Sequence, residues 1–354
     1  MKRASPGRIT SQCLLVVGML IATAFAQDHP AHAQDHSFLT IMTRNMDEGT
    51  DFGFILAAAG NLSALQAALG ETFCEVVASN PELRAAQIAD EIAAAQPDLV
   101  SLQAVSKWQS SLLFCPGAAI GPPTTIDAET ALLNRLAVDG VSYHVVSELD
   151  EFSSTSIPGL PLSFLDRDVL LARDEPDGQL SIANVQAQHF STLSVLPLAP
   201  GINVTILRGW ISADATVRGR TARVIATHLE SFFEPVQEAQ AQELVTGPAS
   251  TSLPVVIAGD LNSGPGSTQI ASYNMLTQNA GFTDTWTATR PNDPGFTDGF
   301  YTEDPLTPST PSMRTDLILV RGAVVPSAPK DHLVGTEVPH PSDHAGVVAK
   351  VTIP

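Results

Sequence analysis

The sequence predicts a single α/β domain. Stretches rich in β-branched and apolar residues alternate with helix-like stretches, and neither an internal repeat nor a linker interrupts the alternation. The chain has 354 residues, of which 44% are hydrophobic and 16% charged, and this composition suits one large globular domain or two small ones. The clearest strand is 255–258, Val-Val-Ile-Ala, a continuous apolar run typical of a strand buried on both faces.

The other strands are expected where short apolar runs end at a polar residue or a turn. They cover residues 37–45, 99–103, 143–146, 169–171, 210–213, 224–227, 316–321 and 347–352. The pattern predicts a turn near Gly219 between 210–213 and 224–227. It also predicts an irregular segment at 152–167, which is rich in Ser, Pro and Leu.

Five helices are expected between these strands, at residues 54–69, 81–96, 128–138, 237–245 and 270–279. Gly60 interrupts the first. The second has Asn80 as its N-cap and Pro81 at its first helical position. Gly140 and Gly281 follow the third and fifth helices and stop them. A long loop rich in Pro, Thr, Asp and Gly is expected at 295–312.

The N-terminus has the pattern of a secretory signal. Three basic residues precede an apolar run at 13–24, and the sequence Ala-Phe-Ala at 24–26 offers a cleavage site, with a later alternative ending at residue 33. The run is shorter than the roughly 20 residues of a membrane span, which favours export over a transmembrane anchor. Residues 1–26 are therefore assigned to a signal peptide and 37–354 to one domain. The expected location is secreted or periplasmic, and no later segment reads as a membrane span.

Two cysteines remain after such a cleavage, Cys74 and Cys115. An even pair in an oxidising compartment predicts a disulfide, and two free buried thiols are the alternative.

The net charge is −19, from 18 Lys and Arg against 37 Asp and Glu. This charge repels a polyanion at long range and offers no basic nucleic-acid groove. Divalent ions can offset the repulsion locally.

Polar side chains that suit phosphoester chemistry follow several of the predicted strands. They are Asn45, His228, Asp260, Asn262, Asp316, Asp343 and His344. Ligands of open α/β sheets bind at the carboxyl ends of strands, and carboxylate and amide oxygens suit a hard cation. Each residue alone also reads as a turn or surface residue.

Six motifs occur in the order found in the endonuclease/exonuclease/phosphatase superfamily, which the chain resembles from about residue 38 to 352. They are Thr-Arg-Asn at 43–45, Gln-Pro-Asp-Leu-Val-Ser-Leu-Gln at 96–103, Thr-His-Leu at 227–229, Gly-Asp-Leu-Asn at 259–262, Arg-Thr-Asp-Leu-Ile-Leu-Val at 314–320 and Ser-Asp-His at 342–344. That superfamily contains DNase I-like nucleases, sphingomyelinases and inositol-polyphosphate phosphatases. The sequences at 42–45 and 341–347 are similar to those of a secreted bacterial branch.

The resemblance implies a DNase I-like four-layer α/β sandwich of two packed mixed sheets flanked by helices. It also implies phosphoester hydrolysis with Mg²⁺ or Mn²⁺. By position, Asn45 and Asp343 would lie in or beside the metal shell, and Asp260 and Asn262 would orient water and phosphate. His344, held by Asp316, would be the general base or contact the transition state. In the same scheme, His228 would bind a phosphoryl oxygen or protonate the leaving group.

One position departs from the superfamily pattern, in which Leu-Gln is followed by the principal metal-binding Glu. Here the residue after Gln103 is Ala104. Gln103 faces the opposite side of the strand and cannot replace it without a change of register. Glu48 or Asp51, in the loop after Asn45, are the candidate substitutes.

Two function classes remain open at this point. The first is a secreted metal-dependent phosphoester hydrolase, phosphodiesterase- or nuclease-like, acting on nucleic acid, a phospholipid head group or a small phosphoester. The second is a catalytically inactive family member that acts as a binding or structural protein, because of Ala104. The apolar stretches Phe232-Phe233 and 157–162 are either core or contacts to a lipid surface. The oligomeric state is not indicated.

Overall fold

Two large mixed β-sheets pack face to face in the part of the chain that the computed structural model describes. That part comprises residues 37–110, 115, 124–154, 162–174, 179–300, 309–323, 325 and 330–354, within a unit covering residues 36–354. The predicted signal peptide and its cleavage site lie outside the described residues.

The first sheet has eight strands in the order β15 (His332–Val334), β16 (Gly346–Ile353), β1 (Ser37–Asn45), β2 (Leu99–Gln103), β6 (Leu162–Arg173), β3 (Lys107–Ser110) and β4 (Thr124–Asp127), with β5 (Tyr143–Ser154) also paired to β6. The second has six, in the order β13 (Thr283–Asp284), β14 (Asp316–Arg321), β12 (Val255–Asp260), β11 (Arg220–His228), β10 (Gly209–Val217) and β7 (Leu180–His189). A separate hairpin pairs β8 (Ser194–Ala199) with β9 (Ile202–Ile206).

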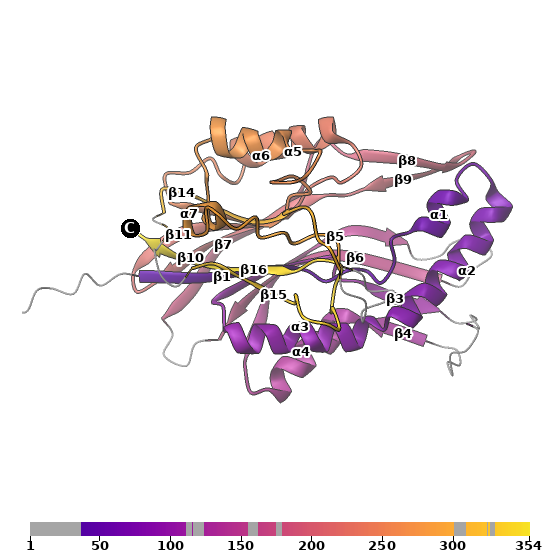
Figure 1. The fold of residues 1–354 in the computed structure, drawn as a ribbon, viewed down its shortest axis with the longest axis horizontal. Coiled ribbons are helices and arrows are strands. Elements are labelled where there is room, and N and C mark those ends of the chain that lie inside the picture. Colours follow the sequence, from indigo (N-terminus) through magenta and orange to yellow (C-terminus); the bar gives the residue numbers. More distant parts are fainter. Residues whose placement is uncertain are drawn as a thin grey trace, which may run out of the picture. The chain divides into compact units, whose positions relative to one another are not determined.

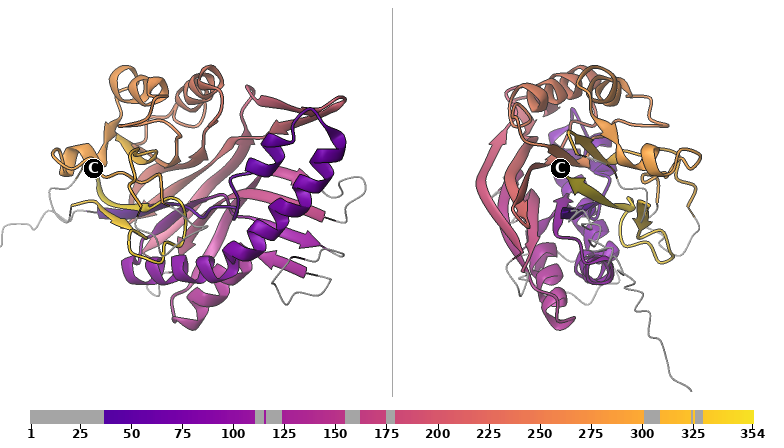
Figure 2. Two further views of the ribbon diagram at one scale, coloured as in Figure 1. Left: turned by 45° about the vertical axis from the view of Figure 1, so that its right-hand side comes forward. Right: turned by 90° about the vertical axis from the view of Figure 1, so that its left-hand side faces the viewer.

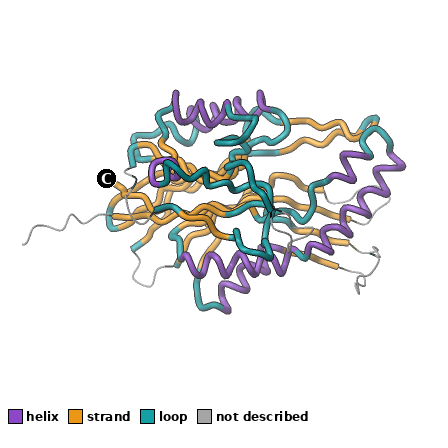
Figure 3. Tube along the Cα trace, in the orientation of Figure 1, coloured by secondary structure: helices purple, strands orange, loops and turns teal. Residues whose placement is uncertain are grey.

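Helices cover the outer faces of both sheets (Figure 1; Figure 3). The helices are α1 (Gly53–Ala57), α2 (Leu62–Ser79), α3 (Pro81–Ala95), α4 (Ala128–Val138), α5 (Glu234–Thr246), α6 (Ala271–Asn274), the π-helix η1 (Met275–Asn279) and α7 (Thr285–Thr289). Helices α3 and α4 pack on the first sheet through residues such as Ile88 and Leu132. Helices α5 and η1 pack on the second through Leu244 and Leu276.

The largest buried cluster lies between the sheets and joins residues such as Leu39 and Ile41 of β1 to Val256 of β12. Two sheets packed through one apolar layer, with helices on their outer faces, form a four-layer α/β sandwich, seen from two further directions in Figure 2. The predicted fold class is therefore confirmed.

Several predicted elements are confirmed closely. Helix α4 covers the predicted residues, and the side chain of Asn80 caps α3, where it accepts from the backbone N–H of Leu83. Gly219 lies between β10 and β11 with φ of 79°, and all six residues of β12 are buried.

The prediction of an irregular segment at 152–167 is wrong for the residues that are described. Strand β5 continues to Ser154 and β6 begins at Leu162, so both strands are 12 residues long. Pairing between β5 and β6 stabilises stretches whose own composition is poor in β-formers. The sequence also missed β7 and the β8–β9 hairpin, and residues 301–308 of the predicted loop lie outside the described part.

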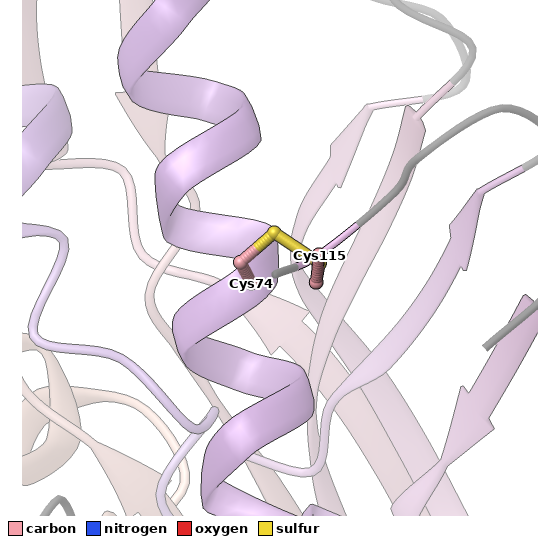
Figure 4. The surroundings of a disulfide bond; sticks show 2 residues. All are labelled: Cys74 and Cys115. Atoms are coloured by element: carbon pink, nitrogen blue, oxygen red, sulfur yellow. A yellow bond between two sulfur atoms is a disulfide. The ribbon is translucent and has the colours of Figure 1, made fainter. Parts of the chain in front are cut away.

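A disulfide joins Cys74 of α2 to Cys115, as predicted (Figure 4). The Cα atoms are 5.3 Å apart and 41 residues apart in sequence. The bond lies at the edge of a small aromatic cluster that includes Phe73, Trp108 and Phe164. No helix among the described residues is both long enough and apolar enough to cross a membrane.

Candidate active site

The register of the second sheet places three predicted site residues side by side. His228 ends β11 opposite Asp260, which ends the parallel strand β12. Asp316 begins the antiparallel strand β14, and it also lies opposite Asp260. The three side chains therefore meet at one edge of the sheet.

Asp260 is the centre of this group and is 1% exposed. Its carboxylate accepts from the side-chain amide of Asn45 at 3.1 Å and from the backbone N–H of Asn262 at 2.9 Å. Nε2 of His228 is 3.5 Å from it, and Nδ1 of His344 is 3.9 Å away. Burial raises the pKa of Asp260, but the positive charge of His344 and these hydrogen bonds outweigh burial and lower it. The carboxylate is therefore ionised at neutral pH.

Asn45 ends β1 of the first sheet, so its contact with Asp260 bridges the two sheets. Asn262 has a left-handed backbone with φ of 48°, and its side-chain amide donates to the carbonyl of Leu229. The site therefore forms where strand ends of both sheets meet.

His344 and Asp316 form a buried pair, with Nδ1 of the imidazole 2.7 Å from a carboxylate oxygen. Burial disfavours the imidazolium, but Asp316, Asp343 and Asp260 together raise the pKa of His344 well above its usual value. His344 is therefore the positively charged histidine of the site.

The environment of His228 lowers its pKa, whereas that of His344 raises it. Nη1 of Arg208 lies 2.6 Å from Nδ1 of His228. Because a guanidinium only donates, Nδ1 must be the acceptor and the ring proton must be on Nε2. Burial and the charge of Arg208 both lower the pKa of His228 well below its usual value. His228 is therefore a neutral Nε2–H donor.

Two buried arginines fix the loops that carry the remaining site residues. Nη1 of Arg44 donates to the carbonyls of Asn45 and His344, and its Nε pairs with Glu91. Arg84 donates to the carbonyls of Met46 and Pro341. These bonds tie the end of β1 to the loop before β16, which are far apart in sequence.

Asp47 and Asp343 lie within this pair of loops. Asp47 is buried and pairs with Arg84 at 3.3 Å. Burial and the neighbouring charge of Asp47 raise the pKa of Asp343 to about 7. Sequence reasoning did not select Asp47. Asp47 follows the end of β1 and has a left-handed backbone with φ of 60°, so the alternation of the strand does not predict its position.

Ala104 is 1% exposed and has a left-handed backbone, with φ of 56°. The preceding Gln103 is fully buried and bonds to Thr43 and Ser101, so it faces away from the position that Ala104 occupies. The strand alternation predicts that Gln103 does not replace the missing carboxylate, and the direction of its side chain agrees with this.

The two candidate substitutes for that carboxylate differ in their surroundings. The backbone carbonyl of Glu48 accepts from Trp108 at 3.1 Å, so the Glu48 loop runs beside the segment that follows Ala104. Burial, together with Asp166 and Asp47, raises the pKa of Glu48 well above its usual value. Asp51 is exposed, and its carboxylate accepts from the backbone N–H of Gly53.

A group of buried acids around Arg208 escaped the sequence analysis. Glu151 and Asp168 are each 1% exposed, and neither carboxylate makes a hydrogen bond within the described part of the chain. Glu151 pairs with Arg208 at 3.7 Å, and Asp168 is 3.8 Å from Nδ1 of His228. The period-2 placement of Asp166 and Asp168 was a signal, but the segment was predicted to be irregular.

The donors of this site suit a hard divalent cation. Asp260, Asp316 and His344 offer ligand atoms within 4.8 Å of one another, all from buried residues. A charged His344 does not bind a cation, so the two carboxylates are the donors of this group. Asn45, Asp47 and Asp343 add further oxygens. Burial and then the charge of Asp47 raise the pKa of Asp343, and a cation would neutralise that negative charge.

Comparisons with known proteins agree with this architecture. Residues 73–344 match the Endonuclease/Exonuclease/phosphatase family. No match is found among curated protein sequences.

Three solved structures are similar to the chain. The endonuclease/exonuclease/phosphatase from Bacteroides vulgatus is 15% identical, with 90% of this chain and 100% of that chain covered and a TM-score of 0.54. The one from Beutenbergia cavernae is 20% identical, with 90% and 72% covered and a TM-score of 0.53. D. rerio TDP2, complexed with a single-strand DNA product, is 18% identical, with 89% and 99% covered and a TM-score of 0.52. Since the family match spans most of the sequence and the structural likeness shows the same fold, the chain belongs to the Endonuclease/Exonuclease/phosphatase family.

Proposed function

We propose that this protein is a secreted, metal-dependent phosphoester hydrolase of the phosphodiesterase or nuclease type. The observation that carries the proposal is the buried His344–Asp316 pair beside an ionised Asp260, in a member of this family. A phosphodiester is anionic, and its hydrolysis needs positive charge beside the phosphoryl oxygens and an ionised group that orients water.

His344 supplies the first requirement. Asp316 holds the ring at 2.7 Å and supports the imidazolium, so that His344 contacts the phosphoryl group as a fixed cation. A charged histidine cannot also accept a proton. The role of general base, which the sequence offered for His344, therefore passes to Asp260 in this proposal.

Asp260 orients and deprotonates the attacking water, because its carboxylate stays ionised. His228 donates its Nε2–H to a phosphoryl oxygen, and Asn262 positions the phosphate. Arg208 keeps His228 neutral, which favours hydrogen bonding over proton transfer to the leaving group.

A metal ion, Mg²⁺ or Mn²⁺, would be held by Asn45 and Asp343, with Asp47 beside them and Glu48 as the carboxylate that replaces the missing one at Ala104. Such an ion supplies charge that neutralises the phosphoryl oxygens. Asp51 is the weaker candidate, because it is exposed and bonds within its own turn.

The substrate class is nucleic acid, a phospholipid head group or a small phosphoester. The D. rerio TDP2 structure holds a DNA product, which favours DNA. The net charge of −19 opposes it. The signal-like N-terminus supports a secreted or periplasmic location.

Hydrolysis of bis(p-nitrophenyl) phosphate tests the activity. Wild type should be active with Mg²⁺ or Mn²⁺ and inactive with EDTA. His344→Ala should reduce turnover by roughly 10² or more, the usual cost of a lost positioned acid–base or electrostatic group. His144→Ala, at an exposed position, is the control and should leave turnover unchanged. A panel of DNA, RNA, sphingomyelin and inositol phosphates then identifies the substrate.

The alternative is an inactive member that acts as a binding or structural protein, and Ala104 is the observation that favours it. No hydrolysis of any substrate and no metal binding by calorimetry would establish that alternative.

A further inference from the structure

Two uncharged segments meet at one end of the described fold. Residues 52–70 and 190–207 contain no Asp, Glu, Lys, Arg or His. The first forms α1 and the start of α2, and the second forms the β8–β9 hairpin, which lies beside them in Figure 1 and in the left view of Figure 2. The backbone N–H of Gly60 donates to the carbonyl of Leu198 at 2.7 Å, so the contact is direct.

The side chains of these segments divide between a small core and an exposed apolar surface. Leu65, Leu69 and Ala199 are buried, with Ile55 and Leu198 packed against them. Phe54, Leu56 and Leu62 remain 44%, 40% and 53% exposed, and Val195 of the hairpin is 52% exposed. We call the surface formed by residues 53–65 and 194–206 the apolar tip.

The apolar tip includes four of the eleven exposed large hydrophobic residues in the described part of the chain. Exposed apolar side chains scattered singly need no explanation, but several on two adjoining uncharged segments indicate an interaction surface. The hot spots of protein–protein interfaces are enriched in Trp, Tyr and Arg, and neither segment contains any of the three. The remaining exposed residues are uncharged: some are small and apolar, such as Ala57 and Pro197, and others are neutral hydrogen-bonding groups, such as Asn61 and Thr205.

We propose that the apolar tip docks on a zwitterionic lipid surface. An uncharged surface can enter the boundary between head groups and acyl chains without burying a charge. The chain as a whole carries −19, so anionic lipids would repel it, and a neutral bilayer is the complementary surface. The tip lies on the membrane and does not cross it.

Both segments of the tip continue directly into the candidate active site. The loop after Asn45 leads into α1, and β9 is followed by Arg208, which contacts His228. Docking at the tip would therefore bring the site close to phosphoesters at a lipid surface. This consequence for the substrate rests on the proposed hydrolase function, whereas docking itself does not.

A fluorescent probe at the tip tests docking without reference to activity. In the full chain with Cys13→Ser, Val195→Cys is labelled with an environment-sensitive fluorophore, and the Cys74–Cys115 disulfide is kept. Phosphatidylcholine vesicles should shift the emission to the blue. Adding Leu56→Asp and Leu62→Asp should weaken partitioning by about a hundredfold, since each apolar side chain lost from the interface costs about tenfold.

The matched control is a probe at Val138→Cys on α4, which is 77% exposed but away from the tip. Its emission should not change, and replacing part of the vesicle lipid by phosphatidylserine should weaken the shift at residue 195. No shift at residue 195, or equal shifts at both positions, overturns the proposal. A shift on raising protein concentration without vesicles, with a dimer in sedimentation velocity, also overturns it and assigns the surface to self-association. Hydrolysis of bis(p-nitrophenyl) phosphate by the same variants reports separately on the active site.

Discussion

Restoring the carboxylate at position 104 is the most informative perturbation of this protein. Ala104→Glu places a carboxylate at the end of β2, beside the Glu48 loop. The left-handed backbone is already occupied by a residue with a Cβ, so Glu adds no backbone strain beyond that of Ala. The expected changes are therefore electrostatic and arise from metal binding.

Without metal, the new carboxylate joins Glu48 and Asp343, whose pKa values are already raised by burial and by neighbouring acids. Metal-free Ala104→Glu should therefore be less stable than wild type. With metal bound, the new carboxylate should stabilise the protein. Loss of a group that merely supports a metal ligand costs about 10- to 100-fold in affinity, so a directly binding carboxylate should gain at least that. This corresponds to about 1.4–2.7 kcal/mol.

Linkage converts this gain into thermal stability. At equal, saturating Mn²⁺, the metal-induced stabilisation of Ala104→Glu should exceed that of wild type by the same free energy. For a domain of this size the difference is roughly 2–4 °C in Tm. Differential scanning fluorimetry with Mn²⁺ and with EDTA measures it, and calorimetry gives the affinities.

Ala104→Gln is the matched control, because it has the same shape without the charge. An equal gain for the Gln variant would refute the electrostatic reasoning. If Ala104→Glu leaves metal affinity unchanged while Glu48→Gln abolishes it, Glu48 has taken over the ligand role. Asp51→Asn should be neutral in either case, since that side chain is exposed.

Three further predictions concern stability. The pKa of His344 is raised in the folded state, so its stabilising contribution is fully present below about pH 6.5 and is lost as pH rises through the folded pKa. Urea unfolding in EDTA should therefore show that the difference in unfolding free energy between wild type and His344→Gln shrinks above about pH 6.5. Arg208→Met leaves buried carboxylates without their cation and should cost about 3–5 kcal/mol of unfolding free energy, whereas exposed Arg220→Met should cost little; equal costs would contradict this assignment. Cys74→Ser should lower the free energy of unfolding by about 2–4 kcal/mol, because it removes the disulfide. Reducing agent should not change the stability of this variant, and a variant as stable as wild type would rule out a stabilising bond.

The sequence alone determined much of the framework. Apolar runs that end at polar residues located β1, β2, β12 and β14, because a strand buried on both faces leaves a long local signal. The family motifs lie at the ends of these strands and predict Asp260, Asp316 and His344 as site residues, which the structure brings within 4.8 Å of one another.

Only the tertiary structure decided which groups share the site and which charge each one carries. Arg208 lies 20 residues before His228, and nothing local indicates that it donates to Nδ1 and keeps that ring neutral. Arg44 links β1 to the loop before β16 by donating to the carbonyl of His344, 300 residues away in sequence. Residues within one strand are related by the period of the backbone, but pairing between strands depends on non-local packing. The protonation of each side chain depends on the neighbours that packing places around it. For this reason His228 is neutral and His344 is positively charged, although both belong to one site.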